Sequence, residues 1–393
     1  MPKKYRVLGI LSLLSVITFL DRNAISIAAV RLTEELSLSN EQFGWIASAF
    51  AVSYGIFEIP TGLWGDRFGE KKVLARIVLW WSLFTAFTGV VTGFASLLVV
   101  RFLFGAGEAG AYPNLAIAVR KWFDAKELGR AQAFIWMASR MGGAITPFVV
   151  VPLQIHFGWR VTFYGLGAIG LIWVLVWWLF YKEPNEERPL NLPLESMSWK
   201  EIGAKRNFWL LLVIYYCYAS GVFFFISWLP KYLHNGLGIS EQNLTYSASL
   251  PFLLAAAGCW FGGSISDALV KKLGMDWGRR IVPMIGLGLS GVVMIGATMT
   301  TNAALAVILL ALGLALMDLT APVAWAIAIG MAGKNSGAVT GAMNTAGLLA
   351  GAITSVAVGY VIAATGSYQV PVVIIGLLLV SGSAVCWLLR VEQ

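Results

Sequence analysis

The chain has 393 residues, of which 58% are hydrophobic and only 12% are charged, and its formal net charge is +8. Soluble domains are about a quarter charged, so this composition indicates a protein that lies in a lipid bilayer. The basic residues form short clusters between apolar runs, which argues against nucleic-acid binding, and the three cysteines lie inside apolar runs, which argues against disulfides or a metal site.

Twelve apolar runs are long enough to cross a bilayer, because a spanning helix needs about 20 residues. The first follows the basic segment MPKKYR, but it is too long for a signal peptide and no cleavage site closes it. The twelve runs are 7–30, 42–64, 73–92, 96–119, 130–153, 160–181, 208–232, 245–267, 280–300, 303–330, 336–362 and 370–389. We therefore predict an all-α membrane protein of two six-helix bundles, 1–181 and 208–393, joined by the polar loop 182–207.

The basic residues gather on one side of this predicted topology. The other side has only Arg31, Arg160 and Lys231. Because basic loops stay in the cytoplasm, we expect both termini to be cytoplasmic. The termini and the even-numbered connections hold, among others, Lys3, Lys4, Arg6, Arg67, Lys71, Lys72, Arg120, Lys121, Lys126, Arg130, Lys271, Lys272, Arg279 and Arg280.

A short pattern repeats in the two halves. The second span ends with Gly62 followed four residues later by Asp66, and the eighth ends with Gly263 followed four residues later by Asp267. Basic residues follow each pair. A parallel internal repeat predicts this kind of echo.

Four separated segments carry distinctive motifs: FLDRNAIS (19–26), GLWGDRFGEKKVL (62–74), RFLFGAGEAGAYPN (101–114) and GAVTGAMNTAGLLAG (337–351). Together they resemble the major facilitator superfamily, and within it the anion:cation symporter family of sugar-acid, hexuronate and galactonate transporters. The segment 62–74 is similar to the superfamily's loop between helices two and three, with Glu70 where a basic residue is more usual. RFLFGAGEAGAYPN (101–114) is similar to the family's helix-four motif, and FLDRNAIS (19–26) and GAVTGAMNTAGLLAG (337–351) add to the likeness. The resemblance implies a fold of twelve helices in two bundles.

Seven ionisable residues lie well inside the predicted spans, where each charge costs a few kcal/mol. Six belong to the first half, which suggests that this half handles protons and an anion while the second is more neutral. Estimated depths place Asp21, Arg22 and Arg101 in one layer, and Glu108 with Arg140 in another. The seven residues are Asp21, Arg22, Glu58, Arg101, Glu108, Arg140 and Asp318.

These charges either lock helices together or serve a ligand. Structural ion pairs are replaceable by apolar residues at little cost, and arginine binds carboxylates through a planar fork. The resemblance implies that Arg22 and Arg101 contact an anionic substrate, while Asp21 and Glu108 take up protons. We hypothesise that a proton on Asp21 governs the anion on the adjacent Arg22.

The remaining assignments are less direct. Arg140 either binds a second substrate carboxylate or neutralises Glu108. The roles of Glu58 and Asp318 stay open between structural pairing, a neutral state and function. Other expected substrate contacts are the Tyr54 hydroxyl in the second span and, through the family resemblance, Trp325 and Asn344 in the second half.

The resemblance also makes the cytoplasmic loop after the second span a gate that holds one transport state. Gly62 permits close helix contact there, and Asp66 can accept a hydrogen bond at a helix end. A solvated basic loop would explain Lys71 and Lys72 equally well. The gating residues expected are Gly62, Asp66, Arg67, Gly69, Lys71, Lys72 and Arg120.

The predicted function is a proton-coupled symporter that imports a small organic anion, such as a hexuronate, aldonate or aldarate, by alternating access. No enzyme or ATPase signature is present, so we expect a transporter driven by the proton gradient without a cofactor. The resemblance implies a monomer, which we expect in the plasma membrane, such as a bacterial inner membrane. Two alternatives stay open. One is a multidrug/proton antiporter, because SRMGGAITPF (139–148) partly matches its motif; the other is an anion sensor that signals through the 182–207 loop.

Overall fold

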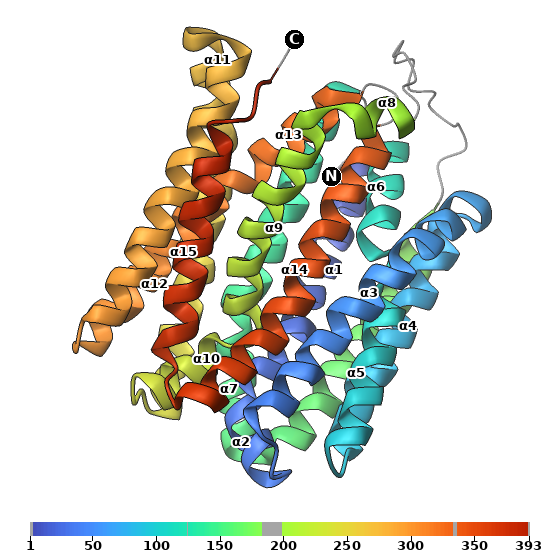
Figure 1. The fold of residues 1–393 in the computed structure, drawn as a ribbon. Coiled ribbons are helices and arrows are strands. Elements are labelled where there is room, and N and C mark those ends of the chain that lie inside the picture. The colour runs from blue at the N-terminus through green and yellow to red at the C-terminus, as the bar shows by residue number, and fades with distance from the viewer. Residues whose placement is uncertain (1–2, 124, 183–198, 333–335, 392–393) are drawn as a thin grey trace. The chain divides into compact units, whose positions relative to one another are not determined.

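The computed structural model describes residues 3–123, 125–182, 199–332 and 336–391, and all regular elements in them are helices (Figure 1). The chain divides into two compact units, Met1–Leu190 and Asn191–Gln393. Within the described residues, nine helical stretches are long and apolar enough to cross a membrane. Two of the nine contain a non-helical glycine, Gly158 (φ 80°) or Gly274 (φ 81°), and so hold two of the predicted spans each.

Unit 1 is built from helices that begin and end at recognisable signals. A capping box between Ser39 and Gln42 begins the third helix. Gly69, at φ 83°, ends that helix and begins the next one, a conformation that favours glycine. The helices are α1 (Lys3–Ile27), α2 (Ala29–Glu35), α3 (Asn40–Phe68), α4 (Glu70–Phe87), α5 (Phe94–Glu108), α6 (Ala111–Trp122) and α7 (Ala125–Phe180).

Unit 2 is also helical, and its C-terminal segment is tied back onto it. Arg280 donates to the backbone carbonyls of Cys386 and Trp387, and the Val391 N–H donates to Asp276. The helices are α8 (Trp199–Ala204), α9 (Arg206–Ser227), α10 (Leu229–Lys231), α11 (Glu241–Met299), α12 (Ala303–Asp318), α13 (Thr320–Ala332), α14 (Ser336–Thr365) and α15 (Gln369–Cys386).

The two units pair their helices in the same way. In unit 1, α1 and α4 pack on α7, and α3 packs on α5. In unit 2, α9 packs on α14, and α12 and α15 pack on α11. We count membrane spans, with two spans each in α7 and α11 and one span in each of the pairs α5–α6 and α12–α13. On this count each unit pairs its first span with its fifth, its second with its fourth and its third with its sixth. This agreement extends the sequence repeat to the packing.

Two predicted spans are broken near their middle. The run expected at 96–119 folds as α5 and α6, because Ala109 is extended (ψ 137°) and Gly110 has φ 82°. The run expected at 303–330 folds as α12 and α13, separated by Leu319. Pro322 lacks the N–H that would bond to the carbonyl of Asp318, which accounts for the second break.

We expect any side chain at Gly105 to destabilise the contact between α3 and α5. A Cβ atom there would lie 2.7 Å from the Phe50 carbonyl oxygen and 2.2 Å from the Ser53 hydroxyl. Because backbone cannot yield as a side chain does, G105A should lower the free energy of unfolding by roughly 1–3 kcal/mol. Thermal unfolding of the purified protein measures this. Gly9→Ala is the control, since a Cβ on Gly9 meets no atom within 4 Å, and equal melting temperatures for the two variants would contradict the prediction.

Candidate functional site

An ion pair between α1 and α5 lies at the centre of unit 1. The Arg22 Nε donates to Glu108 Oε1 at 2.5 Å, and the Glu108 side chain is fully buried. This pair crosses the two layers expected from sequence, which grouped Arg22 with Asp21 and Glu108 with Arg140. A contact between the two layers is possible because an arginine side chain extends several ångströms from its backbone.

Aromatic rings surround the Arg22 guanidinium. Its carbon lies 4.7 Å from the centre of the Tyr54 ring and 5.2 Å from that of Phe50. Phe19 and Tyr112 lie at 5.5 and 5.7 Å. Cation–π attraction holds a guanidinium in such a shell without using up its N–H donors. Tyr54, whose hydroxyl was expected to contact a substrate, has its ring against the Arg22 guanidinium. The other three rings were not predicted.

Arg101 brings a second guanidinium close to the first. It is 3% exposed and lies 4.5 Å from the Phe104 ring and 5.3 Å from the Phe50 ring. Phe50 thus contacts both arginines. Arg101 also lies within electrostatic range of Glu108 and Asp21. The helix-one and helix-four residues predicted for the site are therefore brought together.

Asp21 faces a different neighbour from Arg22. Consecutive residues in a helix point about 100° apart, and Asp21 lies beside Trp81 and Thr85 of α4. Its side chain is buried, and the Trp81 indole and the Thr85 hydroxyl are hydrogen-bond donors that face its carboxylate. The carboxylate beside the Arg22 guanidinium is that of Glu108. A proton on Asp21 would therefore act on an anion at Arg22 through the other charges of the cluster, since the ion-pair partner of Arg22 is Glu108.

Several buried polar atoms of this cluster make no hydrogen bond to the described residues. Buried donors and acceptors are normally paired, because an unmade hydrogen bond costs about 1–3 kcal/mol. Here unpaired donors from two arginines occur with an unpaired carboxylate oxygen, a combination suited to binding an anion and a proton. The atoms are Arg22 Nη2, Arg101 Nε and Glu108 Oε2.

The break between α5 and α6 positions Tyr112 against the site. Its ring stacks on Trp136 at 4.8 Å, and its hydroxyl is 2.8 Å from the Ser139 hydroxyl. The next residue along α7, Arg140, is 7% exposed and has its guanidinium 5.8 Å from the Phe19 ring. Arg140 therefore contacts the same aromatic shell as Arg22. Tyr112 was present in the helix-four motif but was not singled out.

The other predicted residues belong to helices other than α1 and α5, which carry the ion pair. Glu58, on α3, is half-buried and within electrostatic range of Tyr54. In unit 2, Trp325 lies on α13 and Asn344 on α14, both half-buried. Asp318, whose role was open, is fully buried and accepts a hydrogen bond from the Tyr218 hydroxyl at 2.6 Å.

The predicted gating residues have varied surroundings. A Cβ on Gly62 would lie 3.4 Å from the Pro113 ring, which agrees with close helix packing. Arg67 and Lys72 are exposed, and the Lys71 ammonium lies 5.1 Å from the Trp178 ring. The side chains of Asp66 and Arg120 lie outside the described part of the chain.

Glu70, the unusual residue of this loop, is fully buried. It accepts from the Lys121 ammonium at 2.7 Å and from the Tyr181 hydroxyl. Tyr181 stacks on Trp177 with ring centres 3.9 Å apart, and the Trp177 indole donates to the Lys71 carbonyl. Glu70 therefore joins α4 to α6 and α7, a role that its departure from the family pattern did not reveal.

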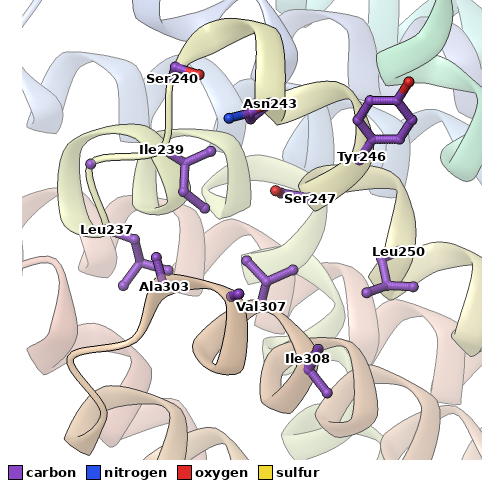
Figure 2. Close-up of a pocket in the computed structure, with 12 residues that line it drawn as sticks. Leu237, Ile239, Ser240, Asn243, Tyr246, Ser247, Leu250, Ala303, Val307 and Ile308 are labelled. Atoms are coloured by element: carbon purple, nitrogen blue, oxygen red, sulfur yellow. The ribbon is translucent and has the colours of Figure 1, made fainter.

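Figure 2 shows a separate cavity, of about 620 Å³, in unit 2. Its walls come from the loop before α11, with Leu237 and Ser240, from Tyr246 on α11 and from Val307 on α12. None of the residues predicted for substrate or protons lines it, and its lining residues carry no acid or base.

Comparisons with known proteins show which family the chain is similar to. Residues 11–355 match the profile of the Major Facilitator Superfamily. The chain is 34% identical to the probable sulfoacetate transporter of Cupriavidus necator, covering 97% of this chain and 92% of the relative. It is 32% identical to the hexuronate transporter of Bacillus subtilis, covering 93% and 90%. A crystal structure of a bacterial homolog of the lysosomal transporter Spinster superposes with a TM-score of 0.84 at 20% identity, covering 99% and 97%.

Proposed function

The chain belongs to the Major Facilitator Superfamily, and from that premise we propose that it is a proton-coupled symporter that imports a small organic anion. The family and the relatives are transporters, which confirms that the chain is a multi-pass membrane protein and not an enzyme. The relatives named as sulfoacetate, hexuronate and galactonate carriers support an organic anion as the cargo. A short acid with a carboxylate or sulfonate group is the proposed substrate.

The observation that carries the proposal is the Arg22–Glu108 pair with its unpaired donors. Arg22 Nη2 and Arg101 Nε are buried without a hydrogen-bond partner among the described residues. A carboxylate or sulfonate oxygen would satisfy both, and the aromatic shell would exclude water from the contact. A lipophilic cation, the cargo of the antiporter alternative, would meet two guanidinium groups of its own charge sign.

Protonation of Glu108 is the proposed coupling step. While ionised, Glu108 holds the Arg22 Nε and competes with an anion for the guanidinium. A proton on Glu108 removes that competition, so that Arg22 binds the anion and both enter together. Carrying one negative charge inward costs about 2.3 kcal/mol per 100 mV of inside-negative potential. One proton cancels this cost and a second makes uptake electrically favourable.

The remaining parts of the proposal concern topology and setting. We propose twelve spans with both termini in the cytoplasm, in agreement with the basic residues of the even-numbered connections. The protein would act as a monomer in the plasma membrane. The proton gradient would drive it, and no cofactor would be needed.

Liposomes containing the purified protein and a trapped pH dye test this function. Sulfoacetate, glucuronate, galactonate and glucarate are added outside in turn, with no imposed gradient. Interior acidification with one of them, absent from protein-free liposomes, is the expected result and identifies the substrate class. Entry of a labelled acid without acidification would overturn proton coupling. Silence across the panel, with movement of a cationic dye, would overturn anion transport.

A further inference from the structure

We infer that Asp318 is a proton-binding residue of the transport cycle, the second-half counterpart of Glu108. This inference rests on the proposed symport function but adds a site in unit 2. The sequence alone left Asp318 without a role. Its place in the repeat, its burial and its hydrogen bond now supply one.

The two acids occupy the same place in two broken helices. Glu108 is the last residue of α5, and Asp318 is the last residue of α12. A short interruption follows each: Ala109 (ψ 137°) and Gly110 (φ 82°) in unit 1, and in unit 2 the single residue Leu319, which keeps helical dihedral angles (φ −57°, ψ −29°). After the break, the third residue of the next helix is a proline in both units, Pro113 in α6 and Pro322 in α13. The one-residue difference in spacing between acid and proline thus equals the difference in length of the two breaks.

Packing against the preceding helices supports this equivalence. Gly62 and Gly263, which share a sequence pattern, each face one of these two prolines in the structure. A Cβ on Gly62 would lie 3.4 Å from the Pro113 Cβ, and a Cβ on Gly263 would lie 3.7 Å from the Pro322 Cβ. The equivalent glycine therefore contacts the equivalent proline in each unit. With the one additional residue between α5 and α6 taken into account, Asp318 corresponds to Glu108.

Each acid also bonds to the first long helix of its own unit. Glu108 accepts from Arg22 on α1, and Asp318 accepts from the Tyr218 hydroxyl on α9 at 2.6 Å. A tyrosine hydroxyl can either donate or accept. When Asp318 gains a proton, its new O–H can donate to the Tyr218 oxygen, so the contact survives in both protonation states.

The surroundings of Asp318 are tightly packed. α11 approaches this stretch through Gly258, Gly262 and Gly286, where a Cβ would lie 2.2–2.7 Å from carbonyl oxygens of residues 315, 319 and 316. The Thr320 hydroxyl is buried and has no hydrogen-bond partner among the described residues. A purely structural role would be filled by an asparagine, which offers Tyr218 the same acceptor without an ionisable group in the bilayer.

The proposed step is a reversible protonation. A proton from the outer solution binds an Asp318 carboxylate oxygen, forming one O–H bond, and the same proton leaves to the inner solution when the anion is released. Each cycle then carries one proton more than Asp21 and Glu108 alone provide. No other bond forms or breaks.

The number of protons per anion in liposomes tests the inference. Potassium diffusion potentials are varied at a fixed pH gradient, and the voltage at which net anion flux is zero gives the ratio. Asp318→Asn should lower the ratio by one proton, a loss of about tenfold in accumulation for each unit of pH gradient. Asp318→Glu should retain the ratio of the unmodified protein.

Matched variants separate this role from structural damage. Ser290 is fully buried and donates to the Gly313 carbonyl of α12 at 2.7 Å, so Ser290→Ala disturbs the same helix without removing an acid and should leave the ratio unchanged. An unchanged ratio in a folded D318N protein overturns the inference. If D318N does not fold, Tyr218→Phe decides: its pH profile of anion exchange moves if Asp318 titrates, and an unmoved profile overturns the inference. Absence of acidification by the unmodified protein would instead refute the symport function itself.

Discussion

Replacing Glu108 by glutamine is expected to leave a protein that binds the anion but loses the effect of protons on that binding. Glutamine resembles the protonated acid in shape and charge, so Arg22 stays released in E108Q at every pH. Anion affinity should then no longer rise on acidification. Accumulation at steady state should fall about tenfold for each unit of pH gradient, because one proton is no longer carried.

Two measurements on E108Q check this expectation. Anion-dependent thermal stabilisation is recorded between pH 5 and pH 8, and should be flat for E108Q but steep for the unmodified protein. Exchange of labelled for unlabelled anion at equal pH on both sides should persist, which shows that the variant is folded and active. An E108Q protein whose binding still strengthens at low pH would show that another group releases Arg22.

The second large effect is expected for Arg22 replaced by lysine. The variant keeps the positive charge beside Glu108 but loses the planar fork of donors and the stacking with Tyr54 and Phe50. Loss of one charge-assisted hydrogen bond costs about 1.5–3 kcal/mol, which corresponds to a 10- to 150-fold weaker affinity. Transport at low anion concentration should fall by the same factor.

Titration calorimetry with the substrate found in the liposome assay measures the affinity of R22K. Arg31→Lys is the matched control, since Arg31 lies on α2 and donates to the Gln154 carbonyl at 3.2 Å. It makes the same chemical change away from the site and should bind as the unmodified protein does. An R22K protein with unaltered affinity would remove Arg22 from the proposed anion site.

The sequence was informative where a residue's chemistry is unusual for its surroundings. Charges such as Arg22, Arg101 and Glu108 stand out in apolar runs, so the members of the site could be named. Their partners could not. Arg22 and Glu108 are 86 positions apart, and only the packing of α1 against neighbouring helices decides that Glu108, and not the adjacent Asp21, meets the guanidinium.

The aromatic residues around Arg22 could not be identified from the sequence for a different reason. Phe50 and Tyr112 touch the arginine, but phenylalanine and tyrosine are common throughout the chain, so nothing in their local sequence separates them from interior packing. The helix break after Glu108 had a local signal in Gly110 and Pro113. It was hidden because the apolar run continues through both residues and reads as one uninterrupted span.

Glu70 bears on how this protein could be engineered. Consensus design exchanges an uncommon residue for the one its relatives usually carry, and position 70, where the superfamily's loop more often has a base, would be an obvious choice. Here a base would be buried beside the Lys121 ammonium that now bonds to Glu70. Breaking a buried pair in this way costs about 3–5 kcal/mol. Glu70 and its partners Lys121 and Tyr181 act together, so a design method that treats each sequence position alone would destabilise the protein that it aims to improve.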